Sequence, residues 1–380
     1  MHILFWAAFY TPFPGGYANS LHGLAKRLVE RGHRVTVITA KLQGWSSEET
    51  IDGVRVLRFE CWNPKALNES FPIPKWGALK RVVHKIHEPV DIVSTQTRFF
   101  PSSFWGWWYA KRRKLPVVHV ERGARHTVAA PLTTFIGKIL DHTQGWLLAR
   151  FSTKVVGVSG AAMEFLKHLG ARDAITIFNG VDVDYWSENT TSRSDITFVG
   201  RVVEAKGAQD LITALAQIQE SRPHLLENRN LNIVGEGSFL ETLQHIAHEL
   251  NMTDKVVFHG ELNTEKVRDV LYRTTIFVNP SYSEGLPRCV LEAGAAGCAV
   301  IATDVGGTRD ILVNKRVGRL VSPRAVGGIQ EALVELLSDD KERKEIAAHL
   351  QTHIEKNFSW PMVTDQYETL FKSIINSKSE

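Results

Sequence analysis

Two glutamates in the C-terminal half, Glu284 and Glu292, have a spacing that can place both beside one anionic ligand. They stand eight residues apart, about two and a quarter helical turns, in the segment Ser-Glu-Gly-Leu-Pro-Arg-Cys-Val-Leu-Glu. A helix beginning near Pro287 would contain Glu292 and leave Glu284 in the preceding loop, together with Gly285 and Leu286. The unpaired amides and the dipole at that helix start favour a negatively charged group. The alternative is a capping carboxylate and a solvated helix glutamate.

Two cations, Arg201 and Lys206, lie in a glycine-flanked loop earlier in the same half. The expected strand before them ends at Gly200, and the expected helix after them covers residues 208–218. Cations at the carboxyl end of a strand can bind one diphosphate. As plain surface charges they would be unfavourable beside a helix N-terminus, so we favour the binding role. Gly235, which follows the next expected strand, belongs to the same edge of the sheet.

The N-terminal half carries weaker signals at the ends of its expected strands. Gly15 and Gly16 stand in the first strand-to-helix loop, where open α/β sheets bind ligands, although a plain turn with positive φ is the alternative. They do not complete Gly-x-Gly-x-x-Gly, so a nicotinamide fingerprint is absent. Arg122, Arg125 and His126 follow the strand expected over residues 116–121, and a lone loop histidine is more often incidental.

These segments resemble glycosyltransferase family 4. The family's Glu-x7-Glu motif corresponds to Glu284 and Glu292, and its Gly-Arg-x4-Lys-Gly motif is matched at every fixed position, Gly200, Arg201, Lys206 and Gly207. The resemblance implies that Glu284 and the loop after it, Gly285, Leu286 and Pro287, hold the donor sugar, and that Glu292 hydrogen-bonds the ribose of the nucleotide. It also implies that Gly15 and Gly16 approach the donor phosphate.

The resemblance further implies that Arg201 and Lys206 neutralise the leaving diphosphate, so we expect no metal and no cofactor beyond the nucleotide sugar. One departure concerns Arg122, which stands before Gly123 where family members often carry histidine. Two alternatives stay open: His126 takes over that catalytic position, or Arg122, with Arg125 nearby, binds an acidic group of the acceptor.

The alternation of strands and helices predicts an α/β protein, and 380 residues suit two domains. By resemblance we expect the GT-B architecture: two facing Rossmann-like domains with parallel sheets and a site between them. The expected domains are an acceptor-side domain at residues 1–170 and a nucleotide-sugar domain at 171–357. The terminal helix, within residues 358–380, is expected to cross back to the first domain.

The function implied is that of a retaining hexosyltransferase acting without a metal. A UDP- or GDP-sugar would donate to a hydroxyl of a glycan or lipid-linked acceptor, in the biosynthesis of cell-surface polysaccharide or glycolipid. Two alternatives remain, a nucleotide-sugar epimerase or hydrolase on the same fold and, less favoured, a Rossmann oxidoreductase.

Composition restricts the partners and the compartment. A net charge of +4 is too small to indicate nucleic acid, and three cysteines without a disulfide or zinc spacing favour a reducing, cytoplasmic setting. The segment from Phe99 to Lys114 combines tryptophans with a basic run. It predicts either peripheral contact with the inner face of the cell membrane or a buried helix with a solvated end.

Overall fold

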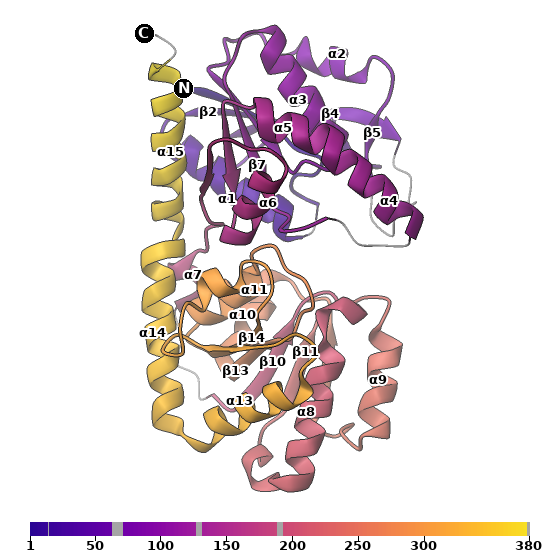
Figure 1. Cartoon of the computed structure of the whole chain (residues 1–380), viewed down its shortest axis with the longest axis vertical. Helices are drawn as coiled ribbons and strands as arrows, with labels where there is room; N and C mark the ends of the chain where they lie inside the picture. The colour runs from indigo at the N-terminus through magenta and orange to yellow at the C-terminus, as the bar shows by residue number, and fades with distance from the viewer. Residues whose placement is uncertain (14, 63–70, 127–130, 188–192, 378–380) are drawn as a thin grey trace. The chain divides into compact units, whose positions relative to one another are not determined.

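The computed structural model describes residues 1–13, 15–62, 71–126, 131–187 and 193–377. The chain folds as two α/β units: unit 1 is Met1–Gly180 with Trp360–Glu380, and unit 2 is Val181–Ser359. Each contains a parallel sheet flanked by helices (Figure 1), as the strand and helix pattern predicts. The expected boundary after residue 170 lies ten residues before the observed one. The difference arises because β9 (Ala174–Thr176) pairs with β8 (Lys154–Gly157) and therefore belongs to unit 1.

Unit 1 is built on a nine-stranded sheet in the order β3-β4-β2-β1-β6-β7-β8-β9, with β5 paired to β4. Pairing is parallel except at β3 and β5, which run antiparallel to β4. The inner strands β1, β6 and β7 are buried along their whole length, as expected for strands covered on both faces, although β6 ends in Ser-Thr-Gln and β7 contains His119 and Glu121. The strands besides β8 and β9 are β1 His2–Trp6, β2 Arg34–Lys41, β3 Glu48–Ile51, β4 Val54–Trp62, β5 Ile73–Pro74, β6 Ile92–Gln96 and β7 Val117–Glu121.

The terminal helix of the chain packs in unit 1, against α1. Trp360 begins this helix, and its ring lies so close to Gly23 and Gly180 that a Cβ at either glycine would overlap it. Arg31 reaches Glu368 at 2.9 Å on the same seam. The helices of unit 1 are α1 Gly16–Glu30, α2 Ala78–Val83, α3 Pro101–Arg112, α4 Pro131–Leu140, the π-helical η1 Asp141–Gly145, α5 Trp146–Phe151, α6 Gly160–His168 and α15 Trp360–Asn376. Residues 378–380 of the expected terminal segment lie outside the described residues.

Unit 2 has a six-stranded parallel sheet in the order β12-β11-β10-β13-β14-β15. Helices α8, α9 and α13 lie on one side of this sheet and α10 and α11 on the other (Figure 1). Its strands are β10 Asp195–Val199, β11 Leu231–Val234, β12 Val256–Gly260, β13 Thr274–Asn279, β14 Ala299–Thr303 and β15 Arg319–Val321. Its helices are α7 Val183–Ser187, η2 Glu204–Lys206, α8 Ala208–Ser221, η3 Pro223–Leu226, α9 Leu240–Glu249, α10 Thr264–Arg273, α11 Arg288–Ala295, α12 Thr308–Ile311, α13 Val326–Ser338 and α14 Asp340–Phe358.

The strand orders place a topological switch point in each unit. The chain runs outward from β1 through β2 and then returns to β6 in unit 1, and it runs outward from β10 and returns to β13 in unit 2. Open α/β sheets bind ligands at the carboxyl ends of the strands beside such a reversal. Among the described residues, no helix has both the length and the apolar character needed to cross a bilayer.

Candidate functional site

Three loops of unit 2 meet at the carboxyl edge of its sheet, following β10, β13 and β14. These strands are neighbours with parallel pairing, so their carboxyl ends share one edge. The amide of Tyr282 donates to the carbonyl of Ala205 at 2.8 Å, which joins the first two loops. The amide of Gly307 donates to the carbonyl of Gly285 at 2.6 Å, which joins the second and third. A Cβ at Gly306 would overlap the carbonyl of Glu284, so the third loop needs glycine there.

Lys206 and Glu284, predicted to act together from distant parts of the sequence, form an ion pair in this loop cluster. Their Nζ and Oε1 atoms are 2.7 Å apart, and their side chains are 21% and 10% exposed. Asn279, the last residue of β13, directs its Nδ2 to the same carboxylate oxygen at 3.4 Å. A cation and a carboxylate are thereby held side by side, largely shielded from water, at the switch point.

Arg201 lies in the same loop as Lys206, with an exposed side chain. The loop is tied to its neighbour because the amide of Gly200 donates to Val234 at 3.0 Å and that of Val202 donates to Glu236 at 2.8 Å. Gly235 has a φ of 130°, and a Cβ on it would overlap the carbonyl of Gly200. The two predicted glycines are therefore brought together, and they let two loops run closely beside Arg201.

Glu292 lies within α11, which begins at Arg288, and Glu284 precedes this helix, so the helix start expected near Pro287 is confirmed. Arg288 donates to Oε1 of Glu292 at 2.8 Å. Burial raises the pKa of Glu292, and Arg288 opposes that rise. Leu286 and Pro287, predicted for the same loop, are buried beneath it.

Cys289 stands between the two glutamates and could be mistaken for a nucleophile. Burial raises the pKa of its thiol to about 12, and the nearby Glu284 carboxylate adds to the rise. The thiolate is the reactive form of cysteine, so the raised pKa disfavours Cys289 as a nucleophile.

Tyr282 was missed in the sequence although it lies within the conspicuous loop after β13. Its hydroxyl donates to Asp210 at 2.9 Å and accepts from Gln209 at 2.8 Å, both on α8. The guanidinium of Arg324 lies 4.0 Å from its ring centroid. Asn279 was missed as well; its place directly before Pro280, at a strand end, was the available signal.

In unit 1 the predicted glycine pair and Arg122 lie at the corresponding switch point, between β1 and β6. Gly15 has a φ of 123° and precedes α1. Tyr17, in the first turn of that helix, donates to the carbonyl of Gln96 at 3.4 Å. Arg122 donates to the side chains of Gln96 at 3.1 Å and Asn179 at 2.7 Å, and it lies 5.4 Å from the Tyr17 ring.

His126 occupies a different place from Arg122. Its Nδ1 is 2.7 Å from Oδ2 of the buried Asp141 in η1. Arg125 is exposed, and its carbonyl accepts from Arg98 at 3.0 Å. Of the two groups proposed for the family's histidine position, the structure brings Arg122 next to the glycine loop and His126 next to η1.

A buried charge cluster that the sequence did not reveal supports this part of unit 1. Arg98 reaches Glu121 at 2.9 Å and Asp141 at 2.6 Å, and all three side chains are almost fully buried. Burial alone would raise the pKa of Glu121, but Arg98, His119 and the amide of Gly123 outweigh it, so that the pKa lies far below its ordinary value. Residues so far apart in sequence carry no local signal of this pairing.

Helix α3 is buried in part and exposed in part, and contact of the tryptophan-rich segment with a membrane stays a prediction. Gly106 and Tyr109 are buried, and Tyr109 contacts Trp6 of β1. Trp105 and Trp108 of the same helix are 36% and 38% exposed. The four cations at residues 111–114, at and after the end of the helix, are exposed.

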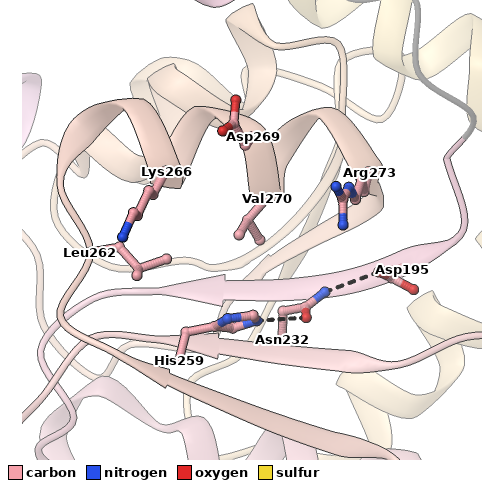
Figure 2. A pocket seen from close by; sticks show the side chains of 8 residues that line it. All are labelled: Asp195, Asn232, His259, Leu262, Lys266, Asp269, Val270 and Arg273. Atoms are coloured by element: carbon pink, nitrogen blue, oxygen red, sulfur yellow. Dashed lines mark hydrogen bonds between the residues drawn. The ribbon is translucent and has the colours of Figure 1, made fainter.

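A separate polar hollow of about 250 Å³ lies under α10, away from the predicted site residues (Figure 2). His259 pairs with Asn232 at 2.9 Å, and Asn232 donates to Asp195 at 3.2 Å. Asp195 starts β10, so this hollow extends toward the amino ends of the strands, whereas the predicted residues follow their carboxyl ends. The residues lining it are Asp195, Asn232, His259, Leu262, Lys266, Asp269, Val270 and Arg273.

Two family profiles match successive parts of the chain. The profile described as "Glycosyltransferase Family 4" matches residues 14–185, and the one described as "Glycosyl transferases group 1" matches residues 186–351. The second covers the loops containing Arg201, Lys206 and both glutamates.

Similarity to individual proteins extends over nearly the whole chain. An uncharacterized glycosyltransferase of Methanocaldococcus jannaschii is 23% identical over 394 aligned residues, covering 98% of this chain and 99% of the relative. The structure of sucrose-phosphate synthase from Thermosynechococcus elongatus superposes with a TM-score of 0.83 at 18% identity, covering 99% of each chain. HepE of Anabaena, solved in complex with UDP-glucose, gives 0.77 at 19% identity, covering 98% of this chain and 100% of that one.

Proposed function

We propose that this chain, which belongs to glycosyltransferase family 4 and is a group 1 glycosyltransferase with the GT-B fold, transfers a hexose from a UDP- or GDP-sugar with retention of configuration. The acceptor is a hydroxyl of a glycan or a lipid-linked sugar, and the product belongs to cell-surface polysaccharide or glycolipid. The observation that carries the proposal is the ion pair of Lys206 and Glu284 at the switch point of unit 2.

This pair supplies both functions that the donor requires. The Lys206 ammonium, together with Arg201 in the same loop, is suited to the diphosphate, whose negative charge grows as it leaves. The Glu284 carboxylate can accept hydrogen bonds from sugar hydroxyls. Glu292, the fifth residue of α11, accepts hydrogen bonds from the ribose hydroxyls in this proposal, in its ionised form.

The proposed transfer is a displacement on one face of the sugar. The bond from the anomeric carbon to the β-phosphate oxygen breaks, and the bond from the acceptor oxygen to the same carbon forms. The departing phosphate oxygen takes the acceptor's proton, so no protein nucleophile is needed, in keeping with the high pKa of Cys289. The protein contributes positioning and preorganised charge.

Arg201 and Lys206 take, in this proposal, the place that a divalent cation has in other phosphate chemistry. Fixed positive charges beside the leaving oxygen stabilise it without metal coordination. On the acceptor side we place Arg122 at the family's histidine position, because its contacts to Gln96 and Tyr17 put it beside the glycine loop. Arg125 is a second acceptor-side cation, and the predicted direct role of His126 stays a prediction.

The surface of unit 1 favours an acceptor at a membrane. Exposed aromatic side chains come from α3, from α5 and from the neighbourhood of β5, and α3 contacts both other elements. The exposed members include Trp76, Trp105, Trp108, Trp146 and Phe151. The basic run at residues 111–114 would add about 1 kcal/mol per cation near anionic headgroups. We therefore propose reversible binding to the inner face of the cell membrane.

Donor identity is tested by thermal shift against a panel of UDP-, GDP- and ADP-sugars. The wild-type protein should be stabilised by one base class, and Glu292→Ala should lose most of the shift because its ribose contact is gone. HepE, a neighbour in fold, binds UDP-glucose, which makes UDP-glucose the first donor to try. If no nucleotide sugar shifts the melting temperature, the proposed donor site is wrong.

The reaction class is tested by product analysis with the donor that binds. Turnover that needs an acceptor and yields the retained anomer supports transfer. Rapid acceptor-free conversion of the donor would instead indicate the epimerase or hydrolase alternative.

Membrane binding is tested by sedimentation with anionic liposomes at low salt. Replacing Lys111, Arg112, Arg113 and Lys114 with Gln should reduce sedimentation and spare donor hydrolysis. A matched control replaces four exposed cations of unit 2, Lys315, Arg316, Lys341 and Lys344, and should keep the binding. Equal losses of liposome binding in the two variants would show that only the net charge of the protein matters. Absence of binding by the wild type would refute the proposal.

A further inference from the structure

We propose that unit 1 contains a binding site for a divalent transition metal of the zinc class, formed by the imidazoles of His126, His142 and His168. One potential ligand nitrogen from each ring lies within 4.8 Å of the others. The three come from the loop after β7, from η1 and from the last residue of α6. Imidazole nitrogen is a preferred ligand for zinc, nickel and copper.

The spacing of the rings is close to what one metal ion requires. A metal about 2.1 Å from each ring nitrogen lies about 3.2 Å from each ring centroid, so tetrahedral coordination puts the centroids about 5.2 Å apart. The observed separations are 5.4 Å between His126 and His142, 5.9 Å between His126 and His168, and 6.2 Å between His142 and His168. Nitrogens bound to one tetrahedral metal lie about 3.4 Å apart. The ligand nitrogens here are within 4.8 Å of one another, so closing the cluster needs an approach of about 1.4 Å between the most distant pair. His142 and His168 are exposed, so rotation of their side chains can supply it.

The ring of His126 is already oriented as a metal ligand would be. Its Nδ1 pairs with the Asp141 carboxylate at 2.7 Å. Metal-binding histidines usually donate their other ring N–H to a carboxylate or carbonyl, which fixes the tautomer and makes the ligating nitrogen more basic. Asp141 is itself held by Arg98 at 2.6 Å, and the Phe165 ring packs edge-on against His126 at 5.0 Å. The Nε2 atom is therefore the nitrogen we assign to the metal.

The local helix geometry places the carboxylate and the second ligand in consecutive residues. Asp141 and His142 begin η1, a π-helical segment between α4 and α5. Such π-bulges occur frequently at functional sites because they change the direction of side chains within a helix. Here Asp141 is buried toward Arg98 and His126, while the neighbouring His142 is exposed toward His168.

The charge balance behind the histidines favours a cation. Within the part of the chain that the structure describes, Arg98 is the guanidinium that contacts both Glu121 and Asp141. Its single positive charge is outnumbered by two carboxylates that are fully buried. A metal on the three neutral imidazoles would offset the remaining negative charge through the Asp141–His126 bond. Three protein ligands leave a fourth position for water or another small ligand.

This inference concerns unit 1 alone and does not depend on the proposed transfer reaction. A bound ion would cross-link the loop that carries Arg122 and Arg125 to η1 and α6. It would thus hold these three segments together, while the diphosphate is still handled by Arg201 and Lys206 in unit 2, so removing the ion should leave the transfer rate unchanged.

The test is direct metal binding by the full-length chain in the absence of any nucleotide sugar. Protein stripped with a chelator is titrated with Co²⁺, whose visible d–d absorption reports tetrahedral coordination, and then with Zn²⁺ in competition. We expect one equivalent of Co²⁺ per chain, displaced by Zn²⁺. Binding should be lost on acidification because the ligands must be neutral imidazoles.

Variants separate this site from adventitious binding by other surface histidines. His142→Ala combined with His168→Ala removes two exposed ligands and should weaken binding by more than about 100-fold, the upper range seen for loss of a supporting residue alone. The matched control combines His245→Ala with His248→Ala, two exposed histidines of α9, and should bind like the wild type. The proposal is overturned if the wild type binds no stoichiometric metal, if the first variant binds unchanged, or if the control loses the binding.

Discussion

Replacing Lys206 with alanine should slow transfer by roughly 100-fold or more, because it removes a cation that acts on the developing charge of the diphosphate. Loss of one preorganised donor typically costs about 2.7–4 kcal/mol of transition-state stabilisation, or about 10²–10³ in rate. The same change also breaks the ion pair with Glu284, whose atoms are 2.7 Å apart. Exposed pairs contribute up to about 1 kcal/mol, and breaking buried ones costs about 3–5 kcal/mol. With exposures of 21% and 10%, we expect a loss of about 2 kcal/mol in folding stability.

Two explanations of a slow Lys206→Ala enzyme must be distinguished, since Lys206 could act on the diphosphate or merely orient Glu284. A double-mutant cycle with Glu284→Gln separates them. If Lys206 acts on the diphosphate, adding Lys206→Ala to Glu284→Gln should lower kcat by about another 100-fold. If Lys206 only orients Glu284, the double variant should be as fast as Glu284→Gln alone.

The assay is the initial rate of transfer at saturating donor, with kcat and KM determined separately. An interaction made only in the transition state lowers kcat and kcat/KM equally. Lys344→Ala, an exposed lysine of α14, serves as the matched control and should behave like the wild type. Wild-type turnover by Lys206→Ala, with the fold intact, would refute the proposed role of the 201–206 loop.

Three further predictions concern metal, nucleotide binding and stability. Arg201→Ala should also lose about 100-fold in rate, whereas chelator should leave the wild-type rate unchanged; a complete loss restored by Mg²⁺ or Mn²⁺ would show that these cations, and not Arg201 and Lys206, neutralise the diphosphate. Burial raises the pKa of Glu292, so donor binding measured by calorimetry should weaken on acidification at a higher pH than it would for an ordinary glutamate. Glu292→Gln should bind the donor weakly at every pH. Donor binding by the wild type that does not change with pH would exclude the ribose contact. Lys372 and Arg31 hold the pKa of Glu368 in the folded protein at about 2. The ionised side chain therefore contributes about 1 kcal/mol to folding stability at a pH above the pKa that Glu368 has in the unfolded chain. This contribution is lost as the pH falls toward the pKa of the folded state. Urea unfolding of Glu368→Gln should therefore show a deficit at neutral pH that disappears in acid, and a deficit independent of pH would contradict the ion-pair explanation.

Much of the fold and of the donor side was readable from the sequence because the signals are local. Alternating apolar strands and amphipathic helices predict two parallel α/β units, and the glycines and charges after strands 10, 13 and 14 mark a carboxyl edge. Within ten residues, the signals for a helix start predict that Glu284 lies in a loop, that Pro287 stands at the start of the helix and that Glu292 lies inside it.

Pairings across the sheet edge required the tertiary structure. The sequence predicts that Lys206 and Glu284 serve the same ligand, but only the adjacency of β10 and β13 brings their side chains to 2.7 Å. Tyr282 contacts Asp210 of α8 for the same reason, and it contacts Arg324, which follows β15, because β13, β14 and β15 are successive neighbours in the sheet. Contacts of this kind depend on strand order, which the spacing of residues along the chain does not encode.

On the acceptor side, too, some features were predicted from the sequence and others required the tertiary structure. The sequence by itself determined that Arg122 stands where a histidine is usual and left His126 as the competing choice. Only the folded chain placed Arg122 against Gln96, and His126 against Asp141 with His142 and His168 around it. Those histidines are 16 and 26 residues apart along the chain, and they meet because η1 and the last residue of α6 pack beside the loop after β7.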